Sequence, residues 1–176
     1  RGTILMTIAN RSAAMVLATG NKSELSVGYC TLYGDMCGGL APLGDVSKRD
    51  IYAIASLERF AGKVPTSTID KAPSAELAPD QRDEDSLPPY DQLDAILKSW
   101  VEDRQSITDI LLQGNPPQVI EKVVGLIELS EHKRRQSPPI LRISSKAFGM
   151  GRRVPIARSL DGWQFDGLDQ TLPSRN

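Results

Sequence analysis

Apolar residues recur at helical spacing near the start of the chain. Ile4, Leu5 and Ile8 fall on one face of a helix over residues 2–11, a pattern typical of an amphipathic helix. An unbroken apolar run over residues 14–18 follows and leads directly into a polar turn at 19–24, as a buried parallel strand does at its carboxyl end. The order of helix, buried strand and turn predicts an α/β fold with parallel strands.

The rest of the pattern predicts helices separated by two long loops. Residues 28–45 hold five of the 14 glycines and residues 64–90 hold five of the 12 prolines, so both segments are predicted loops. The proline-rich loop exceeds the usual length, which favours a lid, a binding segment or disorder. Helices are predicted over 48–60, capped by Asp45 or Ser47, and over 91–103, 106–112 and 117–129.

Composition narrows the class of protein. The 176 residues carry a formal charge of −1, and their composition is ordinary for one globular domain. No stretch approaches the roughly 20 apolar residues of a membrane-spanning helix, so no membrane partner is expected. Cys30 and Cys37 lack metal-binding spacing, and we expect reduced thiols in a cytoplasmic protein. The first residue, Arg1 rather than Met, indicates a C-terminal piece of a longer chain.

The polar turn after the predicted strand is the first candidate site. In open α/β sheets, ligands bind beyond the carboxyl ends of the strands, where helix N-termini favour anions. Thr19 can donate a hydroxyl to a phosphate or a ribose, and Glu24 can hold Mg²⁺ beside a polyphosphate. The alternative is a capped helix whose Glu24 faces solvent. Lys48 begins a predicted helix, where the dipole disfavours a cation, so a bound phosphate or simple solvent exposure would explain it.

A basic run at 132–135 allows three interpretations: a solvated helix end, an anion site or a nucleic-acid patch. Nucleic acid is disfavoured, because the whole chain is slightly acidic and no aromatic residues interleave the run. A metal at His132 is disfavoured too, since no partner ligand is nearby. The glycine-rich segment 34–39 lacks the spacing of a phosphate-binding or dinucleotide-binding loop.

Four ordered motifs resemble one known family. They are ATGNKSELSVGYCTLYGDMCGGLAPLGDVSK, KAPSAEL, DEDSLPPYDQLD and EHKRRQSPP, and the continuation is ISSKAFGMGRRVPIA. Over residues 1–158 the chain resembles the synthetase domain of the NAD synthetases, in their glutamine-dependent bacterial form. The polar tail at 159–176 lies outside the resemblance. The implied architecture is the second half of a Rossmann-like adenine nucleotide α-hydrolase fold, in which parallel strands precede a mostly helical region.

The resemblance implies a two-step ligase reaction. ATP transfers AMP to the nicotinate carboxylate of deamido-NAD and releases pyrophosphate, and ammonia from glutamine then displaces AMP to give NAD. It implies that Thr19 and Ser74 contact ATP, that Lys48 contacts the phosphates, and that Glu24 binds Mg²⁺. Residues 71–88 match a lid over the nucleotide, and such lids exclude water from a reactive intermediate.

The resemblance is less exact at the residues expected to bind deamido-NAD. Its candidate residues are His132, Lys133, Tyr29, Leu32 and Asp35. Ammonia-only relatives have Lys where Leu32 stands and Asp where Gly39 stands, so this stretch must meet the substrate differently. The family's Ser-Gly-Gly-x-Asp-Ser loop, which binds pyrophosphate, is absent from the 176 residues. It is expected upstream, together with an amidase domain, and the piece alone is not expected to turn over.

Relatives are homo-oligomers, which implies that the first helix packs against its copy. Two other functions remain as alternatives. One is a different ATP enzyme of the same pyrophosphatase-loop type that adenylates another acid or a tRNA base. The other is a non-catalytic RNA-binding module that uses the basic residues of segment 131–158.

Overall fold

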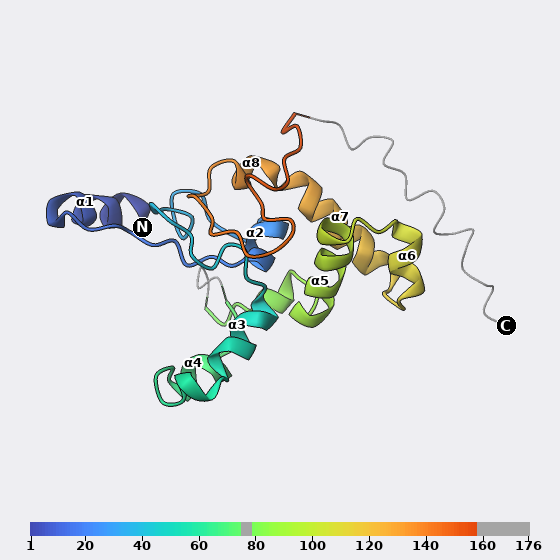
Figure 1. The fold of residues 1–176 in the computed structure, drawn as a ribbon, viewed down its shortest axis with the longest axis horizontal. Coiled ribbons are helices and arrows are strands. Elements are labelled where there is room, and N and C mark those ends of the chain that lie inside the picture. The colour runs from blue at the N-terminus through green and yellow to red at the C-terminus, as the bar shows by residue number, and fades with distance from the viewer. Residues whose placement is uncertain (75–78, 158–176) are drawn as a thin grey trace.

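The computed structural model describes residues 1–74 and 79–157, and it is built mainly from helices (Figure 1). The predicted tail at 159–176 lies outside the described residues. The α-helices are α1 (Gly2–Ser12), α2 (Lys22–Val27), α3 (Lys48–Ala55), α4 (Thr66–Asp70), α5 (Tyr90–Leu97), α6 (Ile107–Leu112), α7 (Pro117–Leu129) and α8 (Glu131–Arg134). Three further helical segments are η1 (Glu58–Phe60), η2 (Asp83–Asp85) and η3 (Lys98–Glu102), the last a π-helical continuation of α5.

The core lies where α2, α5 and α7 pack together (Figure 1). Its side chains are almost all aliphatic, because few aromatic residues are available. Helix α5 contributes Leu93, Ile96 and Leu97, whose spacing of three and four residues places them on one buried face. Helix α7 contributes a matching row: Ile120, Val123, Val124 and Ile127. Within the described ranges, no helix combines the length and apolarity needed to cross a membrane.

The predicted buried strand over residues 14–18 is wrong in its length and burial. Leu17 forms a single parallel bridge with Leu40, and Ala41 forms another with Ile140. These bridges are isolated, and the two described ranges contain no longer strand. Leu17 is 52% exposed and Met15 is 66% exposed. The apolar run therefore pairs in the predicted parallel direction, but on one side only, and no part of the described chain covers its outer face.

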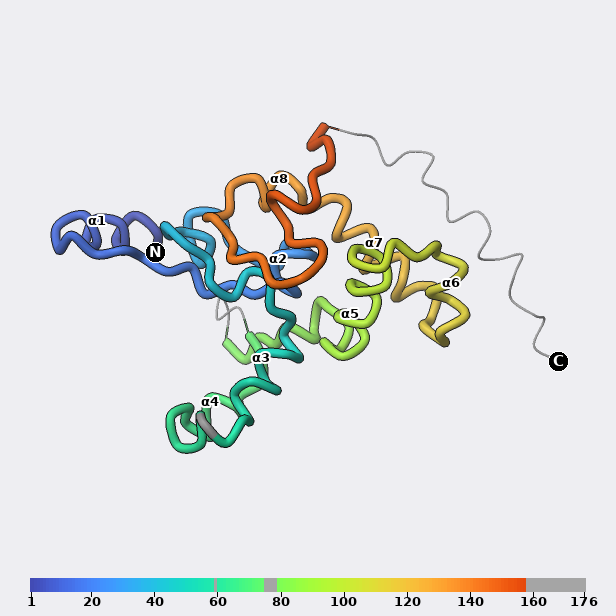
Figure 2. The backbone as a smooth tube through the Cα atoms, viewed as in Figure 1, coloured from blue at the N-terminus to red at the C-terminus, as the bar shows by residue number. Residues whose placement is uncertain are grey.

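Two loops lie beside these bridges. Figure 2 shows segment 39–46 running alongside segment 139–144. Asp45 joins them: its carboxylate accepts hydrogen bonds from the backbone N–H groups of Ile143 and Ser144, and it forms a 2.9 Å ion pair with Lys22. Asp45 is therefore not the cap of α3. That role belongs to Ser47, whose side chain accepts from the N–H of Asp50.

Helix α1 confirms the predicted amphipathic helix but does not bury its apolar face. It projects from the body of the molecule (Figure 1), and Ile4, Leu5 and Ile8 are 45–66% exposed. Its first turn is anchored to the body of the molecule. The N–H of Gly2 donates to the carbonyl of Tyr33 at 2.8 Å, and a Cβ at residue 2 would lie 2.4 Å from that oxygen. A side chain there would therefore push the helix away from the body.

The remaining helices follow the predicted pattern with different ends. Helices α6 and α7 confirm the predictions over 106–112 and 117–129, and Ser106 caps α6 through a reciprocal pair of hydrogen bonds with Asp109. Helix α3 stops at Ala55, five residues before the predicted end, because Leu57 takes an extended conformation before η1. The proline-rich segment 64–90 is not purely a loop, since it contains α4 and η2.

Candidate active site

A cavity of about 560 Å³ lies at the start of α2, bordered by α3, the turn after α2 and the segment before α5. Seven of the side chains predicted from the sequence line it: Thr19, Glu24, Tyr29, Asp35, Lys48, Ser74 and Lys133. They come from segments as far apart in the sequence as Thr19 and Lys133. The fold therefore brings the predicted ATP residues and three of the predicted deamido-NAD residues to one place, while the role of each stays a prediction.

Glu24 is held by the start of its own helix. Its Oε2 accepts from the N–H of Asn21 at 3.1 Å, and the Asn21 side chain accepts from the N–H of Glu24 at 2.9 Å. This reciprocal capping fixes the first turn of α2. The other oxygen, Oε1, pairs with Lys48 Nζ at 3.0 Å. The alternative of a capped helix is thus right about the cap, but Glu24 faces the cavity with only 20% of its side chain exposed.

Lys48 enters the same cavity from the first turn of α3. Besides its ion pair with Glu24, its Nζ lies 5.4 Å from the centre of the Tyr90 ring. A cation over an aromatic face is attracted by the ring's electron density. Lys48 is therefore not an ordinary solvent-exposed lysine, because a carboxylate and an aromatic ring hold its charge inside the cavity.

Buried Asp83 and half-buried Tyr90 form a hydrogen-bonded pair in the proline-rich segment. The Tyr90 hydroxyl donates to Asp83 Oδ2 at 2.6 Å, and burial together with this carboxylate raises the pKa of Tyr90. Asp83 lines the cavity, is only 3% exposed, and has no hydrogen-bond partner for Oδ1 within the described part of the chain. Gln81 Nε2 donates to the Tyr29 hydroxyl at 3.3 Å, which ties this segment to the turn after α2.

Lys133 closes the carboxyl end of α2. Its Nζ donates to the carbonyls of Gly28 at 2.6 Å and Cys30 at 2.9 Å, a favourable place for a cation because helix C-termini carry partial negative charge. Gly28 adopts the left-handed conformation, with φ 67°, and a Cβ there would lie 2.3 Å from Ser130 Oγ. Glycine at residue 28 therefore lets α8 approach α2 and bring Lys133 to the cavity.

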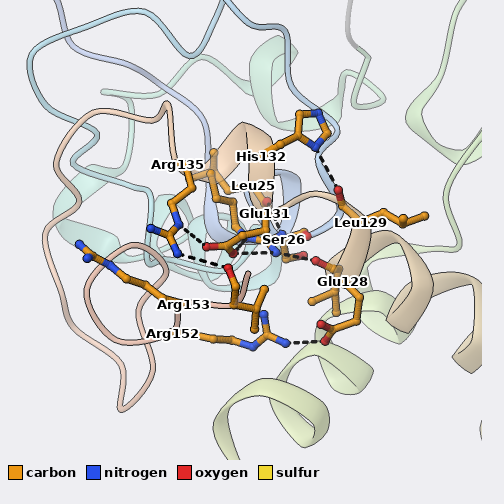
Figure 3. A network of polar contacts seen from close by, with 12 residues as sticks. Leu25, Ser26, Glu128, Leu129, Glu131, His132, Arg135, Arg152 and Arg153 are labelled. Atoms are coloured by element: carbon orange, nitrogen blue, oxygen red, sulfur yellow. Dashed lines mark hydrogen bonds and ion pairs between the residues drawn. The ribbon is translucent and has the colours of Figure 1, made fainter. Parts of the chain in front are cut away.

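His132 and Leu32 do not line this cavity. His132 is exposed, with Nδ1 3.0 Å from the carbonyl of Leu129, and Figure 3 shows it directed away from the neighbouring arginines. Leu32 lines a second cavity, of about 310 Å³, together with Tyr33, Met36 and residues 136–138. Their predicted contact with deamido-NAD stays a prediction.

The basic run is not a solvated surface as a whole. Arg134 is 3% exposed, donates to the carbonyls of Ser26 at 2.6 Å and Ile127 at 2.5 Å, and pairs with Glu131 at 3.2 Å. Burial lowers its pKa to about 10, so it stays charged near neutral pH. Figure 3 shows a second arginine on the same acid, Arg135, paired with Glu131 at 2.8 Å.

The structural importance of Asp83, Tyr90 and Arg134 is not predicted by the sequence. The acidic run at 80–85 and the basic run at 132–135 are visible in the sequence, but charged runs are usually exposed. No signal in the sequence separates Asp83 from its exposed neighbours Glu84 and Asp85. Burial of Cys30 raises the pKa of its thiol to about 11, so this thiol stays protonated near neutral pH.

The side chains of the cavity suit a hard cation such as Mg²⁺ only when a bound ligand supplies further oxygen atoms. No group of three or more potential metal ligands is clustered in the part of the chain that the structure describes. Glu24 alone offers a carboxylate between Lys48 and the start of α2. Mg²⁺ is commonly held by one or two carboxylates together with substrate phosphates and water, so this arrangement suits a magnesium–nucleotide complex.

Comparison with known proteins identifies the relatives of this chain. Residues 1–137 match the family model described as NAD synthase. The chain is 50% identical over 169 residues to the glutamine-dependent NAD(+) synthetase of Acinetobacter baylyi, which covers 94% of this chain and 31% of that protein. It is 51% identical over 160 residues to the Synechocystis protein of the same name, which covers 90% and 29%. The chain thus spans about a third of the length of these relatives.

Solved structures agree with that relationship. A glutamine-dependent NAD(+) synthetase from Cytophaga hutchinsonii matches with a TM-score of 0.74 and 26% identity, covering 97% of this chain and 29% of that one. An NMN synthetase from Francisella tularensis matches with a TM-score of 0.61 and 26% identity, covering 82% and 52%.

Proposed function

This chain belongs to the NAD synthase family, and we propose that it is the C-terminal part of the synthetase domain of a glutamine-dependent enzyme that amidates deamido-NAD to NAD. In this proposal the pyrophosphate-binding loop and the amidase domain lie upstream. The isolated parallel bridges at Leu17 and Ala41 are then one edge of a parallel Rossmann-like sheet. The exposed apolar side chains of Met15 and Leu17 support this, because a second layer would cover them.

The observation that carries the proposal is the convergence of Thr19, Glu24, Lys48 and Ser74 on one cavity. Two substrates must meet there, a triphosphate and a carboxylate, and their negative charges repel. Bringing them together requires cations at fixed positions. Glu24 would hold Mg²⁺, which neutralises charge on the phosphates and on departing pyrophosphate. Thr19 and Ser74, which both line the cavity, would hold the nucleotide.

Lys48 would stabilise the phosphate charge directly. In the first step a carboxylate oxygen of deamido-NAD attacks the α-phosphorus of ATP, and the bond to the bridging oxygen of pyrophosphate breaks. Charge builds up on the leaving pyrophosphate, which a fixed ammonium group stabilises. The 3.0 Å pair of Lys48 with Glu24 supports this role, because the pair keeps the ammonium group inside the cavity before nucleotide binds.

In the second step ammonia attacks the activated carbonyl, AMP leaves, and the nitrogen loses a proton to give the amide. Water would compete with ammonia for the same carbonyl, so the site needs a cover. Segment 71–88 is proposed to supply it. Its described residues Ser74, Gln81 and Asp83 line the cavity, and Gln81 donates a hydrogen bond to the hydroxyl of Tyr29 in the turn after α2, which supports this role.

Deamido-NAD is proposed to bind along the turn after α2, at Tyr29, Asp35 and Lys133. A dinucleotide is longer than the nicotinate end that reacts, so the rest of it would extend past the cavity toward Leu32 and His132. The exposed apolar face of α1 is proposed to pack against a second copy, since Ile4, Leu5 and Ile8 have no cover in the described chain.

The test is a reaction with the full-length protein that contains this chain. With ATP, Mg²⁺, glutamine and deamido-NAD, we expect equal amounts of AMP, pyrophosphate and NAD. The same assay with other carboxylic acids and with tRNA in place of deamido-NAD measures AMP release alone. AMP release that needs one of those acceptors, with no NAD formed from deamido-NAD, would refute the proposal and favour the other ATP enzyme.

A further inference from the structure

We propose that Asp94, which lies outside the cavity lining, is a positioning residue that holds Lys48 in the ATP site through the first turn of α3. The inference rests on the proposed function and extends it to a residue that touches neither nucleotide nor metal. Asp94 lies on α5 and is only 9% exposed. A buried carboxylate in the middle of a helix is costly unless both oxygens find donors, so its partners indicate why it is there.

Both oxygens of Asp94 are bound by other elements. Ser23 Oγ on α2 donates to Oδ1, and the backbone N–H of Arg49 on α3 donates to Oδ2 at 3.0 Å. Ser23 Oγ in turn accepts from the backbone N–H of Lys48 at 2.8 Å. Ser23 is fully buried, so water does not compete for these groups. Asp94 therefore joins α2, α3 and α5 at a single point.

These bonds supply acceptors for the backbone N–H groups at the start of α3. The first N–H groups of a helix have no acceptor within the helix. In α3, Ser23 accepts from Lys48, Asp94 accepts from Arg49, and the helix's own cap, Ser47, accepts from the next residue. The cap fixes where the helix starts. The two acceptors from α2 and α5 fix where that start lies relative to the cavity.

Helices α2 and α5, which Asp94 joins to α3, each carry a side chain that contacts Lys48. Ser23 immediately precedes Glu24, whose Oε1 lies 3.0 Å from Lys48 Nζ. Tyr90, whose ring centre lies 5.4 Å from the same Nζ, is one helical turn before Asp94 on α5. The backbone of Lys48 is thus fixed by the same two helices that hold the contacts of its side chain.

A carboxylate that only joined helices would affect stability and nothing else. If Asp94 is a positioning residue, replacing it weakens ATP binding because Lys48 is displaced. The distinguishing measurement is therefore whether the effect on ATP affinity persists when Lys48 is already absent. Coupling between two residues shows as a departure from additivity in a double-mutant cycle.

The experiment uses Asp94→Asn in the full-length protein, with ATP affinity measured by titration and KM values measured from AMP release. Asn keeps the size of Asp but removes the charge from two hydrogen bonds. We expect ATP affinity to fall about tenfold, the size of one charge-assisted hydrogen bond. The KM for deamido-NAD should stay within about twofold. Asp91→Asn is the matched control, an exposed acid three residues earlier on α5, and should leave both values unchanged.

In a Lys48→Ala background, Asp94→Asn should cause no further loss of ATP affinity, while any loss of melting temperature should persist. A full tenfold loss in that background would overturn the proposal, as would unchanged ATP affinity in the single variant. If Asp94→Asn does not fold, Ser23→Ala carries the test with the same expected result, and normal ATP affinity in that variant overturns it.

Failure of the proposed function has a different signature. A wild-type protein that binds ATP but forms no NAD from deamido-NAD refutes the function, while the titrations still decide the role of Asp94. A wild-type protein that binds no ATP refutes both.

Discussion

The helices α5 and α7 and the N-terminal segment 1–18 both carry regularly spaced apolar residues, but these residues are buried in α5 and α7 and mostly exposed in segment 1–18. In α5 and α7 the residues repeated at three and four positions are 0–2% exposed. In α1 and the segment after it, equivalent residues such as Ile4, Ile8 and Met15 are 57–66% exposed. The pattern therefore indicates which face of an element is apolar, but not whether a partner for that face lies in the same chain.

The largest difference in unfolding free energy is expected between substitutions of two arginines that both pair with Glu131, the buried Arg134 and the exposed Arg135. Arg134→Ala takes one of two arginines from the buried Glu131 and removes the buried donors to the carbonyls of Ser26 and Ile127, so it should destabilise folding by about 3–5 kcal/mol. Arg135→Ala removes a pair whose arginine is 38% exposed and should cost no more than about 1 kcal/mol. Urea unfolding of both variants checks this, and equal losses would contradict it.

The next comparison tests the two apolar faces directly. Ile127→Ala empties a fully buried position and should cost about 2–5 kcal/mol of unfolding free energy. Ile8→Ala, on the exposed face of α1, should change it by less than about 0.5 kcal/mol when the protein is dilute. At high concentration Ile8→Ala should instead weaken self-association, measured by sedimentation. Equal destabilisation by both changes in dilute protein would show that α1 is covered within one chain.

Acid should act on the junction of segments 39–46 and 139–144, which Asp45 joins. Burial alone would raise the pKa of Asp45, but hydrogen bonds from Ser144, Lys22 and Ile143 outweigh it and lower the pKa. The stability that Asp45 supplies is therefore complete above the unfolded pKa of about 3.9 and is lost as pH falls below it. Asp45→Asn should lower neutral-pH stability by about 1–3 kcal/mol and flatten the acid limb of a stability–pH curve. An acid limb as steep as that of the wild type would contradict this.

Only a small effect on stability is expected at the site itself. Glu24→Gln keeps the shape of the capping side chain and should change the unfolding free energy by less than about 1 kcal/mol. Turnover dependent on Mg²⁺ should nevertheless fall about a hundredfold, because a charge is lost where phosphate charge develops. Rates measured over a range of Mg²⁺ concentrations, with melting temperatures as the control, check this. Normal turnover at a normal melting temperature would show that Glu24 does not hold the metal ion.

The sequence predicted elements well where local chemistry sets their ends. Ser106 with Asp109, and the prolines before Gln118, give α6 and α7 their starts. Prediction was poorer where tertiary contacts decide. The run over 14–18 looked like a buried strand, yet only Leu17 pairs within it. The predicted site residues around Thr19 and Glu24 came from the motifs, and the cavity that gathers them came from the fold.

By itself, the sequence determined the helical periods, the caps of α2 and α6, and the residues of its family's motifs, because these depend on neighbours within a few positions. Only the tertiary structure decided which charges are buried. Asp83, Asp94 and Arg134 stand among similar charged residues in the sequence. Each is buried because donors or acceptors from distant helices converge on it, and burial of a charge is tolerated only where the fold supplies such partners.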